Sequence, residues 1–120
     1  MKKVFIMLIA LLLTLAASAA VQYNGLWYNL NSSDNTAEVV ASQGTKYSGD
    51  ISIPSYVNYD NKIYNVTSIG LSAFEGCTGL TSIYIPSGVK TLEQGAFYEC
   101  SSLTYVKIPE GVTKIGRCSF

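Results

Sequence analysis

The chain has 120 residues, which leaves room for one small domain. It carries 8 basic and 8 acidic residues, 9 tyrosines and no histidine. Without Lys2 and Lys3, which belong to the segment considered next, the formal charge is 6 − 8 = −2. A slightly acidic chain does not suit the phosphates of a nucleic acid, so we expect no nucleic-acid partner. Few charges and many tyrosines are typical of a secreted, β-rich protein.

Residues 1–20 have the pattern of a secretory signal peptide, with two lysines, an apolar run over residues 4–15 and small residues at the end. The apolar run is shorter than the roughly 20 residues that a membrane-spanning helix needs. We therefore favour export over anchoring and expect cleavage after Ala19 or Ala20. The mature chain is predicted to have no membrane span and to be secreted or to lie on the cell surface.

Residues 21–50 do not follow the pattern of the rest of the chain. An alternating run over residues 26–30, a turn-rich segment over residues 31–35 and a second strand-like run predict a β-hairpin. We expect this hairpin to cover the open end of a stack of repeats, because such stacks need polar caps to stay soluble.

A 23-residue repeat occupies the remainder. Residues 66–88 align with residues 89–111 without a gap, and a third, incomplete copy ends at Phe120. Residues 51–54 match the end of a copy, but the insertion at residues 55–65 separates them from the next one. A fixed period of this length predicts a solenoid of stacked coils. We expect the natural protein to continue beyond Phe120, or the sequence to be a fragment.

Each copy contains a strand pattern that ends in a turn. In the segment Leu80-x-x-Ile83-x-Ile85, apolar residues two apart predict a strand with one buried face. Pro86 ends this strand because proline donates no ladder hydrogen bond, and Gly88 makes the turn. The stretch around the Ala-Phe pair of each copy is too short for a full helix, so we expect a single helical or 3-10 turn there. The predicted core consists of equivalent positions in successive coils: Val66/Val89/Val112, Ile69/Leu92/Ile115, Ala73/Ala96, Phe74/Phe97/Phe120, Cys77/Cys100, Leu80/Leu103, Ile83/Val106 and Ile85/Ile108.

The spacing Ile-Gly-x-x-Ala-Phe-x-Gly-Cys-x-x-Leu-x-x-Ile-x-Ile-Pro, from Ile69 to Pro86, resembles the BspA-type leucine-rich repeat. The resemblance covers residues 51–120. It implies a β-rich leucine-rich-repeat solenoid, a bacterial source and a surface protein that works as an adhesion or binding module. Two residues depart from the pattern: Glu99 replaces the glycine before a cysteine, and Cys118 stands where the other copies have Ser or Gly. The predicted organisation is a signal peptide at 1–20, a β-hairpin cap at 21–50 and leucine-rich repeats at 51–120, incomplete at the C-terminus.

Cys77 and Cys100 occupy the same position of neighbouring copies, since 100 − 77 = 23. Their Cα atoms should therefore lie near the strand spacing of about 4.8 Å, which permits a disulfide. Equivalent side chains of stacked coils point the same way into the interior, where a cysteine usually serves as a small apolar residue. We expect free thiols.

The sequence offers no catalytic, cofactor or metal site. Without histidine, no base is available to activate Ser, Thr or Cys, and the cysteine spacing does not suit zinc. A pair of carboxylates could in principle hydrolyse a sugar. We interpret the available carboxylates as solvated loop charges: Asp50, Asp60, Glu75, Glu93, Glu99 and Glu110. We expect no enzyme activity and no cofactor.

Three functions stay open at this stage. The resemblance implies a module that binds an extracellular protein or glycan. The first alternative is a structural spacer, in which the repeats extend a larger surface protein and have no ligand of their own. The second alternative is an enzyme, for which no residue constellation is present.

A binding surface, if the chain has one, is predicted on the outward face of the repeat strands. Because apolar residues alternate inward, Ser82 and Tyr84 point outward, and Tyr105 and Lys107 take the same two columns in the next coil. Exposed tyrosines are typical of recognition surfaces because a large ring gains contact area at a small entropic cost. The alternative is that Tyr84 and Tyr105 pair diagonally and only stabilise adjacent strands.

Overall fold

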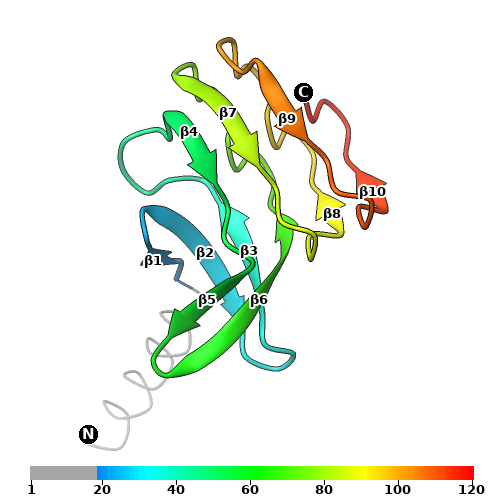
Figure 1. The fold of residues 1–120 in the computed structure, drawn as a ribbon. Coiled ribbons are helices and arrows are strands. Elements are labelled where there is room, and N and C mark those ends of the chain that lie inside the picture. Colours follow the sequence, from blue (N-terminus) through cyan, green and yellow to red (C-terminus); the bar gives the residue numbers. More distant parts are fainter. Residues whose placement is uncertain (1–18) are drawn as a thin grey trace, which may run out of the picture.

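The computed structural model describes residues 19–120, so the predicted signal peptide lies outside the described residues except for its last two positions. The described part is built from strands and turns and contains no helix, and so no helix that could cross a membrane. The ten strands are labelled in Figure 1. Their bounds are β1 Val21–Tyr23, β2 Leu26–Asn31, β3 Thr36–Val40, β4 Gly49–Ser52, β5 Tyr56–Tyr59, β6 Lys62–Ile69, β7 Leu80–Tyr84, β8 Thr91–Leu92, β9 Tyr105–Lys107 and β10 Lys114–Ile115.

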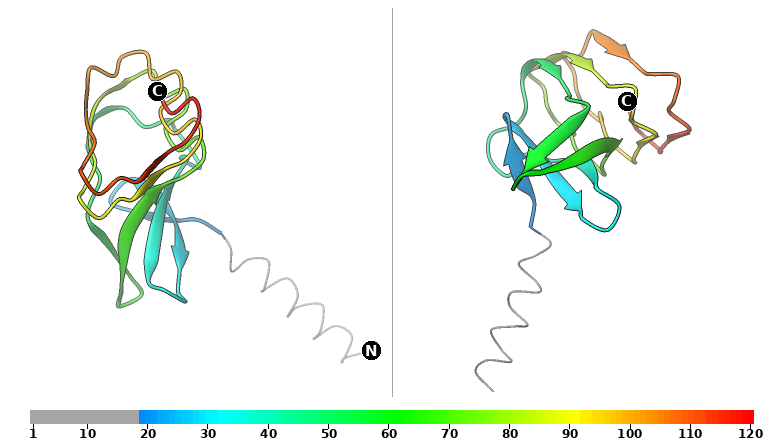
Figure 2. Two further views of the ribbon diagram at one scale, coloured as in Figure 1. Left: turned by 90° about the vertical axis from the view of Figure 1, so that its right-hand side faces the viewer. Right: turned by 60° about the horizontal axis from the view of Figure 1, so that its bottom comes forward.

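The strands form two sheets that share the coils of a solenoid. One sheet is the parallel set β4, β7 and β9, which lie side by side in Figure 1. The other has the order β1-β2-β3-β6-β8-β10, with β5 paired to β6. Seen nearly along the stacking direction, the coils superpose as closed loops (Figure 2, left). Each coil therefore contributes one strand to each of the two sheets.

The repeat coils from residue 66 onward stack through a constant pairing register, whereas β4 and β7 pair at an offset of 84 − 52 = 32 because the insertion at residues 55–65 lies between them. Ser82 on β7 pairs with Tyr105 on β9, an offset of 105 − 82 = 23, and Ile69 pairs with Leu92 at the same offset. The turns are paired from coil to coil as well, since the amide of Phe97 donates to the carbonyl of Ser119 at 2.7 Å. Buried backbone amides need hydrogen-bond acceptors. In these turns the carbonyls of the next coil act as acceptors, as the preceding turn would in a regular helix.

Isolated turns occupy the stretch where a short helical or 3-10 turn was expected. The amide of Glu75 donates to the carbonyl of Ser72, and that of Cys77 to the carbonyl of Phe74, both at 3.1 Å. Left-handed backbone at Ser72 (φ 54°) and Gly76 (φ 69°) interrupts any continuous right-handed helix. The interrupted path turns the backbone amides toward the neighbouring coil.

Core burial follows the predicted ladder in the first complete coil, where all eight positions from Val66 to Ile85 are buried. The prediction is wrong for Ile108, Ile115 and Phe120, which are exposed. A ladder position is buried only when a coil covers it on both sides, and no described coil covers these three on their outer side. The exposed side chains belong to the last coils that the structure describes.

A column of aromatic rings runs through the stack. The rings of Phe74 and Phe97 are nearly parallel, with centroids 5.2 Å apart, and Phe120 continues the column at 5.3 Å. Tyr47 closes its other end, tilted against Phe74 with centroids 4.9 Å apart. Offset aromatic pairs at such distances add stability beyond their buried area.

The N-terminal segment is joined to this column through Tyr47. Strands β2 and β3 form an antiparallel hairpin, and β3 pairs in parallel with β6 of the first coil. The hydroxyl of Tyr47 donates to the carbonyl of Val40 at 2.7 Å and accepts from the amide of Trp27 at 3.0 Å. The hairpin side chains Leu26 and Tyr28 belong to the same buried cluster as the repeats.

The insertion at residues 55–65 forms most of a second hairpin, β5–β6, which projects from the first coil (Figure 1). Positive φ at Asp60 (51°) and Asn61 (61°) gives the two-residue turn that matches strand twist. Tyr56 and Ile63 are exposed on this hairpin.

The phenylalanine column yields a stability prediction. Phe97 is 1% exposed and packs between two rings, so Phe97→Ala should lower the free energy of unfolding by about 3–5 kcal/mol. Phe120→Ala serves as the matched control, because this ring is 56% exposed and contacts one neighbour, and it should cost much less. Denaturant unfolding of both variants measures the difference. Equal losses would contradict the assigned core.

Glu99 yields a second stability prediction. It has φ 60° at the position where the preceding coil has Gly76. A left-handed non-glycine residue costs roughly 1–2 kcal/mol, so Glu99→Gly should raise the free energy of unfolding by about 1 kcal/mol. Gly76→Ala, where an added Cβ has no atom closer than 3.8 Å, should lower it for the same backbone reason. Thermal unfolding that shifts in the same direction for both variants would refute this explanation.

Candidate functional site

The four residues predicted to bind a ligand lie together on the outer face of the β4–β7–β9 sheet. Ser82 is directly opposite Tyr105, and Tyr84 is directly opposite Lys107. They alternate along β7 with the buried Ile83, so their side chains point away from the core. The parallel register therefore brings all four into one two-by-two patch.

Tyrosine rings dominate this patch. Tyr84 is 53% exposed and Tyr105 is 58% exposed. They are diagonal neighbours, at the reach where large side chains on adjacent strands can touch. Lys107 is exposed, whereas Ser82 is half-buried beside the strand that precedes it.

Asp50 completes the patch. The expected loop position is wrong because Asp50 lies on a strand, but its side chain is exposed to solvent as expected. It lies on β4 opposite Ser82, whose hydroxyl donates to Asp50 Oδ1 at 2.7 Å, and the hydroxyl of Thr81 donates to the same oxygen at 2.8 Å. These two donors, Ser82 first, hold the pKa of the carboxyl below its ordinary value. A signal was available: aligning residues 51–54 with residues 83–86 puts Asp50 in the Ser82 position.

A shallow groove of about 200 Å³ runs across these strands. Its lining contains Asp50, Ile51, Ser52, Ser82, Ile83, Tyr84 and Tyr105. A second hollow of about 350 Å³ adjoins it, between Tyr84, Lys107 and the turn at residues 108–111. Tyr84 borders both, so one ring separates two places where a ligand group can sit.

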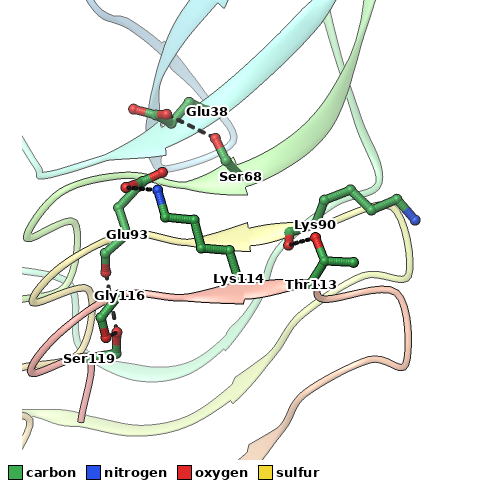
Figure 3. Close-up of polar contacts among 8 residues, drawn as sticks. All are labelled: Glu38, Ser68, Lys90, Glu93, Thr113, Lys114, Gly116 and Ser119. Atoms are coloured by element: carbon green, nitrogen blue, oxygen red, sulfur yellow. Dashed lines mark hydrogen bonds and ion pairs between the residues drawn. The ribbon is translucent and has the colours of Figure 1, made fainter.

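The outer face of the other sheet is occupied by contacts within the protein. Figure 3 shows the carboxylate of Glu38 accepting from the hydroxyl of Ser68 (2.9 Å) and the Glu93–Lys114 ion pair (3.6 Å). Polar groups that satisfy one another have less to offer a ligand, which makes this sheet the weaker candidate.

Possible metal ligands and the cysteine thiols are the remaining reactive groups of the described residues. Among residues 19–120, no group of three or more His, Cys, Asp or Glu side chains could hold a metal ion. Cys77 and Cys100 are free thiols, and burial raises the pKa of both. The thiol of Cys100 also donates to the carbonyl of Phe74 at 3.0 Å. A raised pKa suppresses the thiolate, which is the reactive form.

The shifted pKa of Asp50 can be tested directly. Ser82→Ala removes the larger of the two donors, so the pKa of Asp50 should rise toward its ordinary value in an NMR titration of the carboxyl. Because the folded-state pKa is depressed, this contribution to stability is present above the unfolded-state pKa and is lost as the pH falls through the folded-state value. Ser52→Ala is the control and should leave the pKa unchanged. An unchanged pKa in Ser82→Ala would contradict the assigned hydrogen bond.

Comparison with known proteins assigns the family. Residues 49–120, more than half of the chain, match the model described as BspA type leucine-rich repeat region (6 copies). No curated protein sequence matches the chain.

Solved structures of bacterial leucine-rich repeat proteins share the fold. A leucine-rich repeat protein from Bacteroides ovatus is 37% identical over 83% of this chain, with a TM-score of 0.77. A leucine-rich cell surface protein from Faecalibacterium prausnitzii is 36% identical over 85%, with a TM-score of 0.72. A leucine-rich repeat protein from Bacteroides capillosus is 29% identical, and the alignment covers 82% of this chain and 71% of that protein, with a TM-score of 0.69. The chain spans 26% and 27% of the length of the first two. It belongs to the BspA-type leucine-rich repeat family.

Proposed function

We propose that the protein is an adhesion-type binding module that presents the outer face of β4, β7 and β9 to an extracellular protein or glycan. The observation that carries this proposal is the pair of exposed rings, Tyr84 and Tyr105, on a sheet held rigid by the stacked coils. Rigid aromatic side chains lose little entropy on binding and are frequent in the energetic centres of interfaces. The role needs no catalytic residue, cofactor or metal.

We also propose that the chain is exported and acts outside the cell or on its surface. The pattern of residues 1–20 supports this, with cleavage after Ala19 or Ala20 giving a mature chain without a membrane span. The description of the Faecalibacterium prausnitzii relative as a cell surface protein is consistent with the same location.

Residues 21–50 are proposed to form the N-terminal cap of a solenoid with a 23-residue period. The pairing of β3 with β6 and the packing of Tyr47 on Phe74 support the cap, because they cover the first coil on its outer side. The constant offset between paired strands supports the period. In this organisation the cap keeps one end soluble and leaves the sheet face free.

A structural spacer without a ligand of its own is the second candidate. One observation favours it: the chain spans about a quarter of two longer relatives, so its coils can serve as one section of an extended stack. In that case Tyr84 and Tyr105 would only stabilise neighbouring strands through their diagonal contact.

The double variant Tyr84→Ser/Tyr105→Ser separates the two functions. Capture experiments with immobilised extracellular-matrix proteins and a glycan array identify what the parent protein binds. The double variant should then bind at least about tenfold more weakly, the loss expected when central aromatic contacts are removed. Circular dichroism and the melting temperature must match the parent, so that the loss reports on the surface and not on folding.

The matched control replaces Tyr56 and Ile63 with Ser, because these side chains are similarly exposed on the β5–β6 hairpin. It should retain full affinity. Unchanged affinity in the Tyr84/Tyr105 variant together with a loss in the control would move the site to residues 55–65. A stable parent protein that binds nothing in either assay would favour the spacer.

A further inference from the structure

The carboxylate of Asp50 is held with one oxygen occupied and the other open. Oδ1 accepts hydrogen bonds from both Thr81 and Ser82, and one carboxylate oxygen has two lone-pair positions. Oδ2 accepts no hydrogen bond from the described residues and lies on an exposed side chain. The groove therefore contains a fixed acceptor with room for one donor from outside.

The groove is negatively charged and small. Asp50 is the only charged residue among the lining residues within the described structure, and an exposed carboxyl is ionised at neutral pH. An anionic ligand group would be repelled next to Asp50, because Lys107, the cation of the patch, lines the adjoining hollow and not this groove. The volume of about 200 Å³ lies below the roughly 300–1,000 Å³ of pockets that take drug-sized ligands, so the groove suits a single ring.

The side of the groove opposite the carboxylate is apolar. Tyr84 and Tyr105 contribute exposed ring surface there, whereas the hydroxyls of Ser52, on the same strand as Asp50, and of Ser82 lie on the side of the carboxylate. A pyranose ring has the complementary pattern, with C–H groups on one face and hydroxyl donors around its edge. The C–H face can cover a tyrosine ring while one hydroxyl donates to Oδ2 of Asp50.

A guanidinium group fits less well, although aromatic rings and a carboxylate can also attract a cation. Arginine binds carboxylates best through two parallel hydrogen bonds, one to each oxygen. Oδ1 of Asp50 is already filled by Thr81 and Ser82, which leaves a single-point ion pair on an exposed surface. Such pairs contribute little in water.

From these features we propose that the groove between Asp50 and Tyr105 is a subsite for a neutral pyranose unit of a glycan. Asp50 receives a sugar hydroxyl, and Tyr84 or Tyr105 carries the apolar face of the ring. This inference rests on the proposed binding function, because it names the ligand class for the same face of the sheet.

Saturation-transfer NMR on the purified full chain tests the subsite with defined probes. The probes are the methyl glycosides of glucose, galactose, mannose and N-acetylglucosamine, with N-acetylneuraminic acid and a blocked Gly-Arg-Gly peptide as comparators. At least one neutral glycoside should bind with millimolar affinity, and neither comparator should bind. Asp50→Asn should weaken that glycoside about tenfold, the loss of one charge-assisted hydrogen bond. Tyr84→Ser/Tyr105→Ser should abolish binding.

Tyr98→Ser is the matched control, because Tyr98 is exposed on a turn outside the groove lining, and it should bind like the parent. The subsite would be refuted by a complete lack of glycoside binding, by equal binding in the Asp50 variant, or by binding of the arginine peptide alone. Should glycosides fail while the double tyrosine variant still loses a captured matrix protein, the glycan inference falls and the proposed binding function stands. If the glycosides fail to bind and the double tyrosine variant still binds the captured matrix protein, both the glycan inference and the proposed binding function are refuted.

Discussion

Backbone hydrogen bonding from each coil to the next is the constraint on which the rest of this structure depends. The described chain contains no helix, and many amides in the strands and turns of the repeats donate to the neighbouring coil in addition to the local turn hydrogen bonds. Between the repeat coils from residue 66 onward that pairing repeats at an offset of 23, and a side chain at a given position must therefore lie over its equivalent. Inward positions become ladders such as Phe74, Phe97 and Phe120, and outward positions become columns on a surface.

The same constraint explains how a small chain with few charges can hold a defined surface. Asp50, Ser82 and Tyr105 come from three different coils and are adjacent only because the coils are in register. Their spacing is set by the sheet, and the hydroxyl of Ser82 then orients the carboxylate. A ligand that meets such a surface does not have to order it first, which lowers the cost of binding. Family membership alone would not reveal this chemistry, because function depends on the side chains of the individual site.

Much of this architecture could be predicted from the spacing of residues, and the exceptions have physical reasons. Alternation within the repeat predicted the buried face of the first coil and the outward direction of Tyr84 and Tyr105. It did not reveal Tyr47, which closes the aromatic column from a segment without repeats. It also placed Phe120 in the core, because a repeat pattern assumes a coil on both sides of each position, and no described coil covers Phe120 on its second side. The role of Asp50 depends on hydrogen bonds to side chains of the next coil. A sequence pattern within one coil cannot predict such bonds.

Tyrosine footprinting of the protein with and without a captured partner tests the central claim most directly, that the coil register builds the binding face on β4, β7 and β9. Exposed rings lie on this sheet at Tyr84 and Tyr105, and on the β5–β6 hairpin at Tyr56 and Tyr59. Nitration followed by mass spectrometry reads each position separately. The account predicts that the partner protects Tyr84 and Tyr105 and leaves the hairpin tyrosines reactive. Protection of Tyr56 and Tyr59, with Tyr84 and Tyr105 modified as in the free protein, would contradict it.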